Sequence, residues 1–384
     1  MSDERAFWLA WSQVAGIGPT LLLRMQRHFG TLETAWNART AELAEVEGLG
    51  WHTANVAVEG RSRLDPESLL RQHEKENPNF WTPADADYPR LLLETPDPPS
   101  ILYYRGQVKP LENQGIRVAI AIVGTRAPSD YGRRWTRRIS GALAQAGFTV
   151  VSGLAEGVDT EAHHSCLGAG GRTIAVLGSG LDVIYPWSNR KLADQIAENG
   201  LLLSEYPAGT QPDRVHFPQR NRIIAGLSRA ILVLEAPHKS GALITARVAN
   251  DYGRDVYALP GSLDNSRCKG CLELLNDGAH MILGEKQLLT ALGGLPDYAK
   301  MRSPQDQLLL FDDEPEPETA GLGEPINLEP RLKQVLQVIT PVPTSFDLIV
   351  QQAGLDTGTV SSALSQLEIM GLVAQLPGMR YQKA

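Results

Sequence analysis

The sequence is poor in cysteine and has no long apolar run. Its 384 residues include 3 cysteines, too few for a disulfide-stabilised fold, and this number fits a reducing, cytoplasmic compartment. The first residues lack a basic segment followed by an apolar core, so we expect no secretory signal. No run of about 18 apolar residues occurs, which argues against a transmembrane helix.

Positive charge is also scarce. Lys and Arg number 36 against 44 Asp and Glu, which gives a formal net charge of −8. This balance excludes a protein that coats nucleic acid with a uniformly basic surface, but not a local basic site, because net charge says nothing of its distribution. The length predicts two or three domains at roughly 100–200 residues each.

The usual metal and nucleotide signatures are missing. Cys268 and Cys271 have CxxC spacing, but Cys166 is the only other cysteine, so we predict no zinc site. Neither the GxGxxG fingerprint nor the GxxxxGK[ST] loop occurs, so we predict no dinucleotide or nucleotide cofactor.

Short apolar, β-branched runs recur between residue 116 and about residue 293, and helical patterns lie between most of them. The runs cover residues 118–123, 148–152, 173–178, 200–204, 230–236, 255–260 and 280–283. Strands that are apolar on both faces and alternate with helices indicate a parallel sheet. The fold class predicted here is α/β, with a doubly wound, extended Rossmann-like parallel sheet.

The flanking segments have other patterns. Residues 1–75 have helical patterns, and the turns Gly16-Ile17-Gly18 and Gly48-Leu49-Gly50 are typical of helix–hairpin–helix units. Such turns either contact DNA or serve only as tight turns between helices. The end of the chain predicts three helices and a hairpin, as in a winged helix. We predict a helical domain over 1–77, the α/β domain over 78–294, an acidic flexible linker over 295–330 and a winged helix over 331–384.

Glycine-rich loops follow several predicted strands. Ligands of open parallel sheets bind at the carboxyl ends of the strands, where backbone N–H groups and helix N-termini attract anions. The loops include Gly124, Thr125 and Arg126, then Ser152 and Gly153, residues 178–182, and Ser240 and Gly241. Ser129 is placed to cap the first helix. Together the loops predict a phosphate-binding floor.

A second cluster, Arg214, Phe217, Arg220, Asn221 and Arg222, follows the fourth strand. Arginine pairs with phosphate and a phenyl ring stacks on a base, so the cluster indicates nucleic-acid binding, with a solvated arginine-rich helix as the alternative.

Other polar groups favour structural roles. Arg133, Arg134, Arg137 and Arg138 share one helical face, which we interpret as solvated. His163 and His164 lie near Asp159 and Glu161, but no nucleophile accompanies them, so packing or capping is favoured.

Three stretches together resemble one bacterial family. VGTRAPSDYG (123–132), the stretch from VVSGLAEGVD to VIYP (150–186) and the stretch from FPQRNRIIAG to ALPGS (217–262) are similar to the DNA-processing protein A family, DprA or Smf. The similarity runs over residues 80–285. The helical start also resembles that family's sterile-alpha-motif-like region, and the tail resembles its winged helix.

The resemblance implies a protein that binds incoming single-stranded DNA, protects it and loads the RecA recombinase during natural transformation. It also implies a homodimer through the α/β domain, no cofactor and no enzymatic activity. The DNA-binding residues carried over from the family are Gly124, Thr125, Arg126, Ser152, Gly153, Arg214, Phe217, Arg220, Asn221, Arg222, Ser240 and Gly241. Cys271 stands where the family pattern Ser-x-Gly-x-Asn-x-Leu-Ile has Asn.

We therefore expect Arg126, Arg214 and Arg220 to neutralise phosphates and Phe217 to stack a base. Two alternatives stay open. One is a nucleotide hydrolase with Glu156 and Asp159 as acid and base, and the other is a scaffold whose α/β domain only dimerises. The presumed recognition helix over 356–371 has no Lys or Arg, so we expect the winged helix to contact protein or act as a tether.

Overall fold

The structure is a computed structural model that describes residues 3–293, 330–339, 344–369, 372–376 and 380–383. The chain divides into two compact units, Met1–Leu308 and Leu309–Ala384, and each is described by itself. The predicted linker over 295–330 lies outside the described residues, apart from Pro330. Among the described residues, no helix is both long and apolar enough to cross a membrane.

The first unit begins with six helices, of which α1 to α5 form a core around the buried indoles of Trp8 and Trp11, while Leu70 of α6 packs against Phe80 and Tyr103 of the sheet edge. The Trp11 Nε1 donates to the Leu32 carbonyl oxygen at 3.2 Å. Both predicted glycine turns are present, and Gly16 and Gly48 adopt φ values of +82° and +84° that favour glycine. The helices are α1 (Glu4–Ser12), α2 (Pro19–Phe29), α3 (Leu32–Asn37), α4 (Thr40–Leu43), α5 (Trp51–Arg61) and α6 (Pro66–Glu76).

A nine-stranded sheet follows, in the order β1-β2-β6-β5-β4-β3-β7-β8-β9. The seven strands from β3 to β9 pair in parallel and correspond to the seven predicted runs. Two further strands, β1 and β2, add an antiparallel edge that we did not predict. The strands are β1 (Phe80–Trp81), β2 (Leu102–Gly106), β3 (Ala119–Val123), β4 (Thr149–Ser152), β5 (Arg172–Leu177), β6 (Leu201–Ser204), β7 (Ala230–Val233), β8 (Asp255–Ala258) and β9 (His280–Met281).

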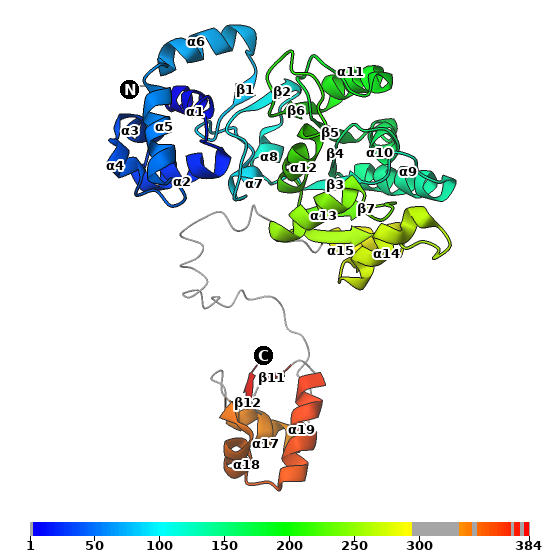
Figure 1. Cartoon of the computed structure of the whole chain (residues 1–384). Helices are drawn as coiled ribbons and strands as arrows, with labels where there is room; N and C mark the ends of the chain where they lie inside the picture. The colour runs from blue at the N-terminus through cyan, green and yellow to red at the C-terminus, as the bar shows by residue number, and fades with distance from the viewer. Residues whose placement is uncertain (1–2, 294–329, 340–343, 370–371, 377–379, 384) are drawn as a thin grey trace. The chain divides into compact units, whose positions relative to one another are not determined.

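Helices cover both faces of the sheet (Figure 1). Side chains alternate along β3, where Ile120 and Ile122 pack in one core and Ala121 in the other. The face that carries Ile120 and Ile122 is covered by α9 (Asp130–Gln145), α10 (Val158–Gly168), α11 (Arg190–Asn199) and α15 (Glu285–Gly293). The face that carries Ala121 is covered by α12 (His216–Leu227), α13 (Gly241–Asp251) and α14 (Lys269–Asn276). The short helices are α7 (Arg90–Leu93), α8 (Pro110–Asn113), η1 (Trp187–Asn189) and η2 (Ser266–Cys268). The doubly wound α/β prediction is therefore confirmed.

The strand order reverses beside β3. The chain adds β4, β5 and β6 on one side of β3, then returns to place β7 on its other side. The crevice at the carboxyl ends of β3 and β7 is the topological switch point, where doubly wound proteins bind ligands.

The second unit is the predicted winged helix. Its sheet has the order β10-β12-β11, and its helices bury Val335, Ile349 and Leu367. The elements are α17 (Pro330–Val338), β10 (Thr344–Ser345), α18 (Phe346–Ala353), α19 (Thr357–Ile369), β11 (Val373–Leu376) and β12 (Arg380–Lys383).

Candidate nucleic-acid interface

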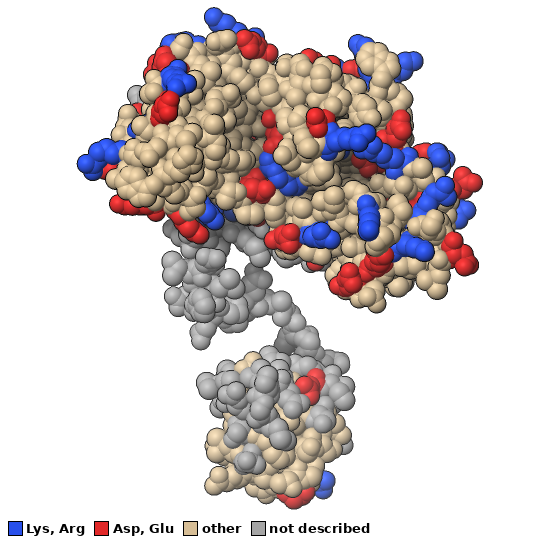
Figure 2. Space-filling view, in the orientation of Figure 1, with Lys and Arg blue, Asp and Glu red and all other residues tan. Residues whose placement is uncertain are grey.

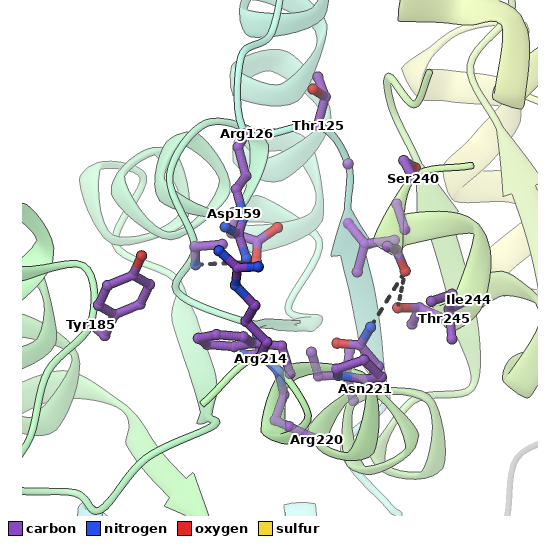
Figure 3. Close-up of a pocket in the computed structure, with 18 residues that line it drawn as sticks. Thr125, Arg126, Asp159, Tyr185, Arg214, Arg220, Asn221, Ser240, Ile244 and Thr245 are labelled. Atoms are coloured by element: carbon purple, nitrogen blue, oxygen red, sulfur yellow. Dashed lines mark hydrogen bonds between the residues drawn. The ribbon is translucent and has the colours of Figure 1, made fainter. Parts of the chain in front are cut away.

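A pocket of about 610 Å³ lies at the switch point, between the end of β3 and the first turns of α12 and α13 (Figure 3). Nine of the twelve residues carried over from the resemblance line it. They are Gly124, Thr125, Arg126, Arg214, Phe217, Arg220, Asn221, Ser240 and Gly241. Segments more than one hundred residues apart thus meet in one place.

Positive charge and an aromatic ring meet at the mouth of the pocket. The Arg126 Cζ lies 5.5 Å from the centroid of the Phe217 ring, and the Tyr185 ring lies 5.7 Å from that centroid. Arg126 and Arg214 are exposed, and neither has an ion-pair partner in the part of the chain that the structure describes. Two guanidiniums are therefore available to an anionic ligand beside a ring that can stack.

Arg220 has a different environment from these two arginines. Its side chain is 4% exposed, and its Nη1 donates to the carbonyl oxygens of Gly153 and Val176. Burial lowers its pKa to about 10, while the neighbouring Asp159 acts in the opposite direction. Because Nη1 donates to backbone carbonyl oxygens under the pocket, we favour a positioning role for Arg220, and its expected contact with a phosphate stays a prediction.

Asp159 lies in the first turn of α10 and is buried. Its Oδ2 accepts from the backbone N–H groups of Gly153 at 3.1 Å and Ala155 at 3.3 Å. Burial raises the pKa of this carboxyl, opposed by Arg220 and by these hydrogen bonds. We predicted that the loop after β4 binds an anionic ligand, but its Gly153 and Ala155 N–H groups bind the Asp159 carboxylate instead. We therefore assign Asp159 a structural role. Glu156 is exposed beside a small adjoining pocket of about 50 Å³.

A second carboxylate fills the start of α9. The buried Glu235 accepts from the Ser129 backbone N–H at 2.7 Å and from the Ser129 hydroxyl at 2.7 Å. The Ser129 Oγ in turn accepts from the Gly132 N–H, which confirms the predicted N-cap. The N-terminus of α9 is therefore already neutralised from inside the protein.

The start of α13 is open. Its N-cap, Ser240, makes no capping hydrogen bond, and the Ser240 Oγ is buried without a partner among the described residues. A Cβ placed on Gly241 would meet no atom within 4 Å. Internal carboxylates bind the N-terminus of α9 and the loop before α10, whereas the N-terminus of α13 offers free backbone N–H groups to a phosphate.

Three predicted residues lie elsewhere. The Ser152 hydroxyl is buried and donates to the Ile122 carbonyl oxygen at 2.7 Å, so it does not line the pocket. Arg222 donates to the Asp97 carbonyl oxygen at 2.6 Å and pairs with Glu205, which turns it away from the pocket. Gly153 lines the adjoining small pocket instead.

The glycine at position 124 serves packing as much as ligand access. A Cβ there would lie 2.6 Å from the Val158 Cγ2 and 2.8 Å from the Glu235 carbonyl oxygen. The close approach of the protein's own chain therefore requires glycine at the end of β3.

The α9 arginines are exposed, as predicted for a solvated face, and the packing role predicted for the α10 histidines is confirmed for His163 alone. Arg137 pairs with Glu161 at 2.7 Å and Arg138 pairs with Glu285 at 2.6 Å. The His163 ring is buried with its Nδ1 2.7 Å from the Thr173 Oγ1, and burial lowers its pKa to about 3. His164 is exposed.

The cysteine difference from the family pattern does not reach the pocket. Cys271 is buried with its Sγ 3.6 Å from the Val233 carbonyl oxygen. Its assignment to the Asn position was also wrong by one residue, because the motif counted from Gly270 places that Asn at Leu272.

Sequence reasoning missed several lining residues, among them Tyr185, Ile244 and Thr245. Figure 3 shows Tyr185 on the side of the pocket opposite Ser240, Ile244 and Thr245, with Arg126 and Arg214 between them. The available signal for Tyr185 was an aromatic residue in the loop after the third predicted strand.

Comparisons with known proteins agree over most of the chain. The family model of DNA recombination-mediator protein A matches residues 79–293, and the model of the DprA winged helix domain matches residues 315–379. Protein Smf of Synechocystis is 52% identical, with 100% of this chain and 99% of that protein covered. The DNA processing protein DprA of Streptococcus pneumoniae is 40% identical over 65% of this chain and 85% of its own.

Two solved structures are also similar. The X-ray structure of DprA from Streptococcus pneumoniae aligns with a TM-score of 0.65 and 34% identity, covering 76% of this chain and 98% of that chain. A DNA processing protein A structure from Helicobacter pylori, whose title describes a single-stranded DNA binding mode, aligns with a TM-score of 0.50 and 34% identity over 56% of this chain and 95% of that chain.

Proposed function

The chain belongs to the DNA recombination-mediator protein A family, and we propose that it binds single-stranded DNA in the pocket at the sheet switch point. The observation that carries the proposal is the union of Arg126, Phe217 and the open N-terminus of α13 in one pocket. We propose that Arg126, Arg214 and the Ser240–Gly241 backbone bind phosphates while Phe217 stacks a base.

Unpaired DNA fits this chemistry better than a duplex. A phenyl ring can stack only on a base whose face is free, and such stacking accepts every base. In Figure 2, acidic and basic side chains are interspersed over the visible face of the first unit. A surface of mixed charge with a local cationic pocket favours binding of DNA in the pocket over nonspecific electrostatic binding of duplex DNA to the whole surface.

We further propose a homodimer through the α/β domain. The strand β9 pairs with β8 and ends the sheet, and Met281 and Leu283 beside this edge are 51% and 70% exposed. An unpaired strand edge with exposed apolar side chains is a surface that a second copy can cover.

The proposed biological role is to protect incoming DNA and to load the RecA recombinase on it during natural transformation. The family description as a recombination mediator supports this role. We propose a binding protein rather than an enzyme, because Asp159 is bound to backbone N–H groups and so does not serve as a free acid or base. The free thiols of Cys166, Cys268 and Cys271 support a cytoplasmic location.

The winged helix is proposed as a protein-contact or tethering module, since α19 carries no Lys or Arg. We retain the four segments 1–77, 78–294, 295–330 and 331–384 as the working domain boundaries.

A mobility-shift titration of the full chain tests the function. Oligothymidylate should shift at a much lower protein concentration than a duplex of equal length. Light scattering of the protein alone should give a mass that matches two chains. Equal affinity for the two DNA forms would contradict the proposal.

A further inference from the structure

One tryptophan stands out on the surface beside the pocket. Trp187 begins η1, in the loop between β5 and α11, and its side chain is 69% exposed. The guanidinium carbon of Arg190 lies 4.6 Å from the centroid of the Trp187 ring, within the range of a cation–π contact. One face of the indole is thus held by a cation while the side chain stays open to solvent.

The turn that carries Trp187 is firmly anchored. The buried Asn189 donates through Nδ2 to the Leu154 carbonyl oxygen at 2.9 Å and to the Thr160 Oγ1 at 2.8 Å. The next helix, α11, buries Leu192 and Ile196 in the core. The exposure of Trp187 therefore follows from a fixed backbone, and a preformed ring loses little entropy when it stacks on a ligand.

The position continues the pocket. Tyr185, two residues earlier, lines both the main and the adjoining pocket, and its ring contacts Phe217. Trp187 follows Tyr185 by two residues in the chain but lines neither pocket, so it lies next along the chain outside them. The charge agrees with a nucleic acid, because Arg190 and Lys191 have no ion-pair partner among the described residues.

We propose that Trp187, braced by Arg190, is a second base-stacking platform for the same DNA strand outside the pocket. This inference rests on the proposed function. The strand leaves the Phe217 position past Tyr185, a base stacks on the free face of the Trp187 indole, and Arg190 and Lys191 neutralise the adjacent phosphates. A protein partner on the same ring is the competing occupant.

The test uses the full chain and oligothymidylates from about 4 to about 20 nucleotides long. Trp187→Ala should weaken binding of the long oligomers by about 5- to 150-fold and leave the shortest oligomer unaffected. Trp187→Phe should keep most of the affinity. Trp51→Ala is the matched control, because Trp51 is 63% exposed on α5 in the helical region.

The outcomes separate the two proposals. If wild type fails to bind oligothymidylate, or if Phe217→Ala binds as well as wild type, the pocket itself is wrong. If Phe217→Ala weakens binding but Trp187→Ala binds every length as wild type does, the platform alone is overturned. A folded Trp187→Ala protein that binds DNA normally but fails to stimulate a recombinase, or changes its mass in light scattering, assigns the ring to a protein partner and also overturns the platform.

Discussion

The Arg126 guanidinium carbon lies 5.5 Å from the centroid of the Phe217 ring, although 91 positions separate the two residues in the chain. One group suits a phosphate and the other suits a base, so a single nucleotide can engage both.

Removing the Arg126 charge should change the salt dependence of binding. Each phosphate contact to single-stranded DNA contributes about 0.7 to the slope of log affinity against log salt concentration, so Arg126→Ala should lower the slope by about that amount. Filter binding at several salt concentrations measures it. Arg134→Ala, which removes an α9 arginine outside the pocket lining, is the control and should leave the slope near wild type.

Removing the Phe217 ring should weaken binding without changing that slope. Phe217→Ala is expected to cost about 1–3 kcal/mol per stacked base, or about 5- to 150-fold in affinity, while Phe217→Tyr keeps a stacking ring and should bind nearly as wild type. Titration with oligothymidylate at one salt concentration measures both variants. Equal losses in the Ala and Tyr variants would argue against stacking.

His163 should make the protein sensitive to acid. Its pKa is lowered to about 3 by burial, whereas an unfolded histidine titrates near pH 6.5. As pH falls below about 6.5, the unfolded state takes up a proton that the folded state excludes, so the free energy of unfolding decreases. Between pH 7 and pH 5, wild type should lose about 2 kcal/mol more than His163→Gln.

Urea unfolding at the two pH values provides the measurement for His163. Parallel losses in wild type and His163→Gln would show that this ring is not the source of the acid sensitivity.

A negative charge beside the terminal strand β9 should dissociate the proposed dimer. Leu283→Glu places a carboxylate beside β9, where burial against a second copy would be costly. Light scattering should then report the mass of one chain. Leu111→Glu changes an exposed leucine on α8 and should leave the dimer intact; a dimer that survives Leu283→Glu would move the interface elsewhere.

The parallel part of the fold could be predicted from sequence because strands buried on both faces appear as short apolar runs. All five residues of β3 are buried, for example. The antiparallel edge was missed for a related reason. The two-residue β1 is too short for a pattern, and only part of β2 is buried, so neither stands out from the proline-rich segment around it.

The position of the site was predictable from sequence, but the hydrogen-bond and ion-pair partners of its side chains were not. Glycine loops indicated which sheet edge binds the ligand, yet Glu235, which closes the start of α9, lies 106 positions from Ser129 and was not foreseen. Arg220 and Arg222 looked equivalent to Arg214 in the sequence. In the structure Arg220 is buried and donates to the Gly153 carbonyl oxygen, while the half-buried Arg222 pairs with Glu205.

The most direct measurement is a crystal structure of the full chain with oligothymidylate. The account predicts a base stacked on the Phe217 ring, a phosphate within hydrogen-bond distance of the Ser240–Gly241 backbone, and Arg126 turned toward a phosphate. A strand bound on another surface, with the switch-point pocket empty, would contradict it.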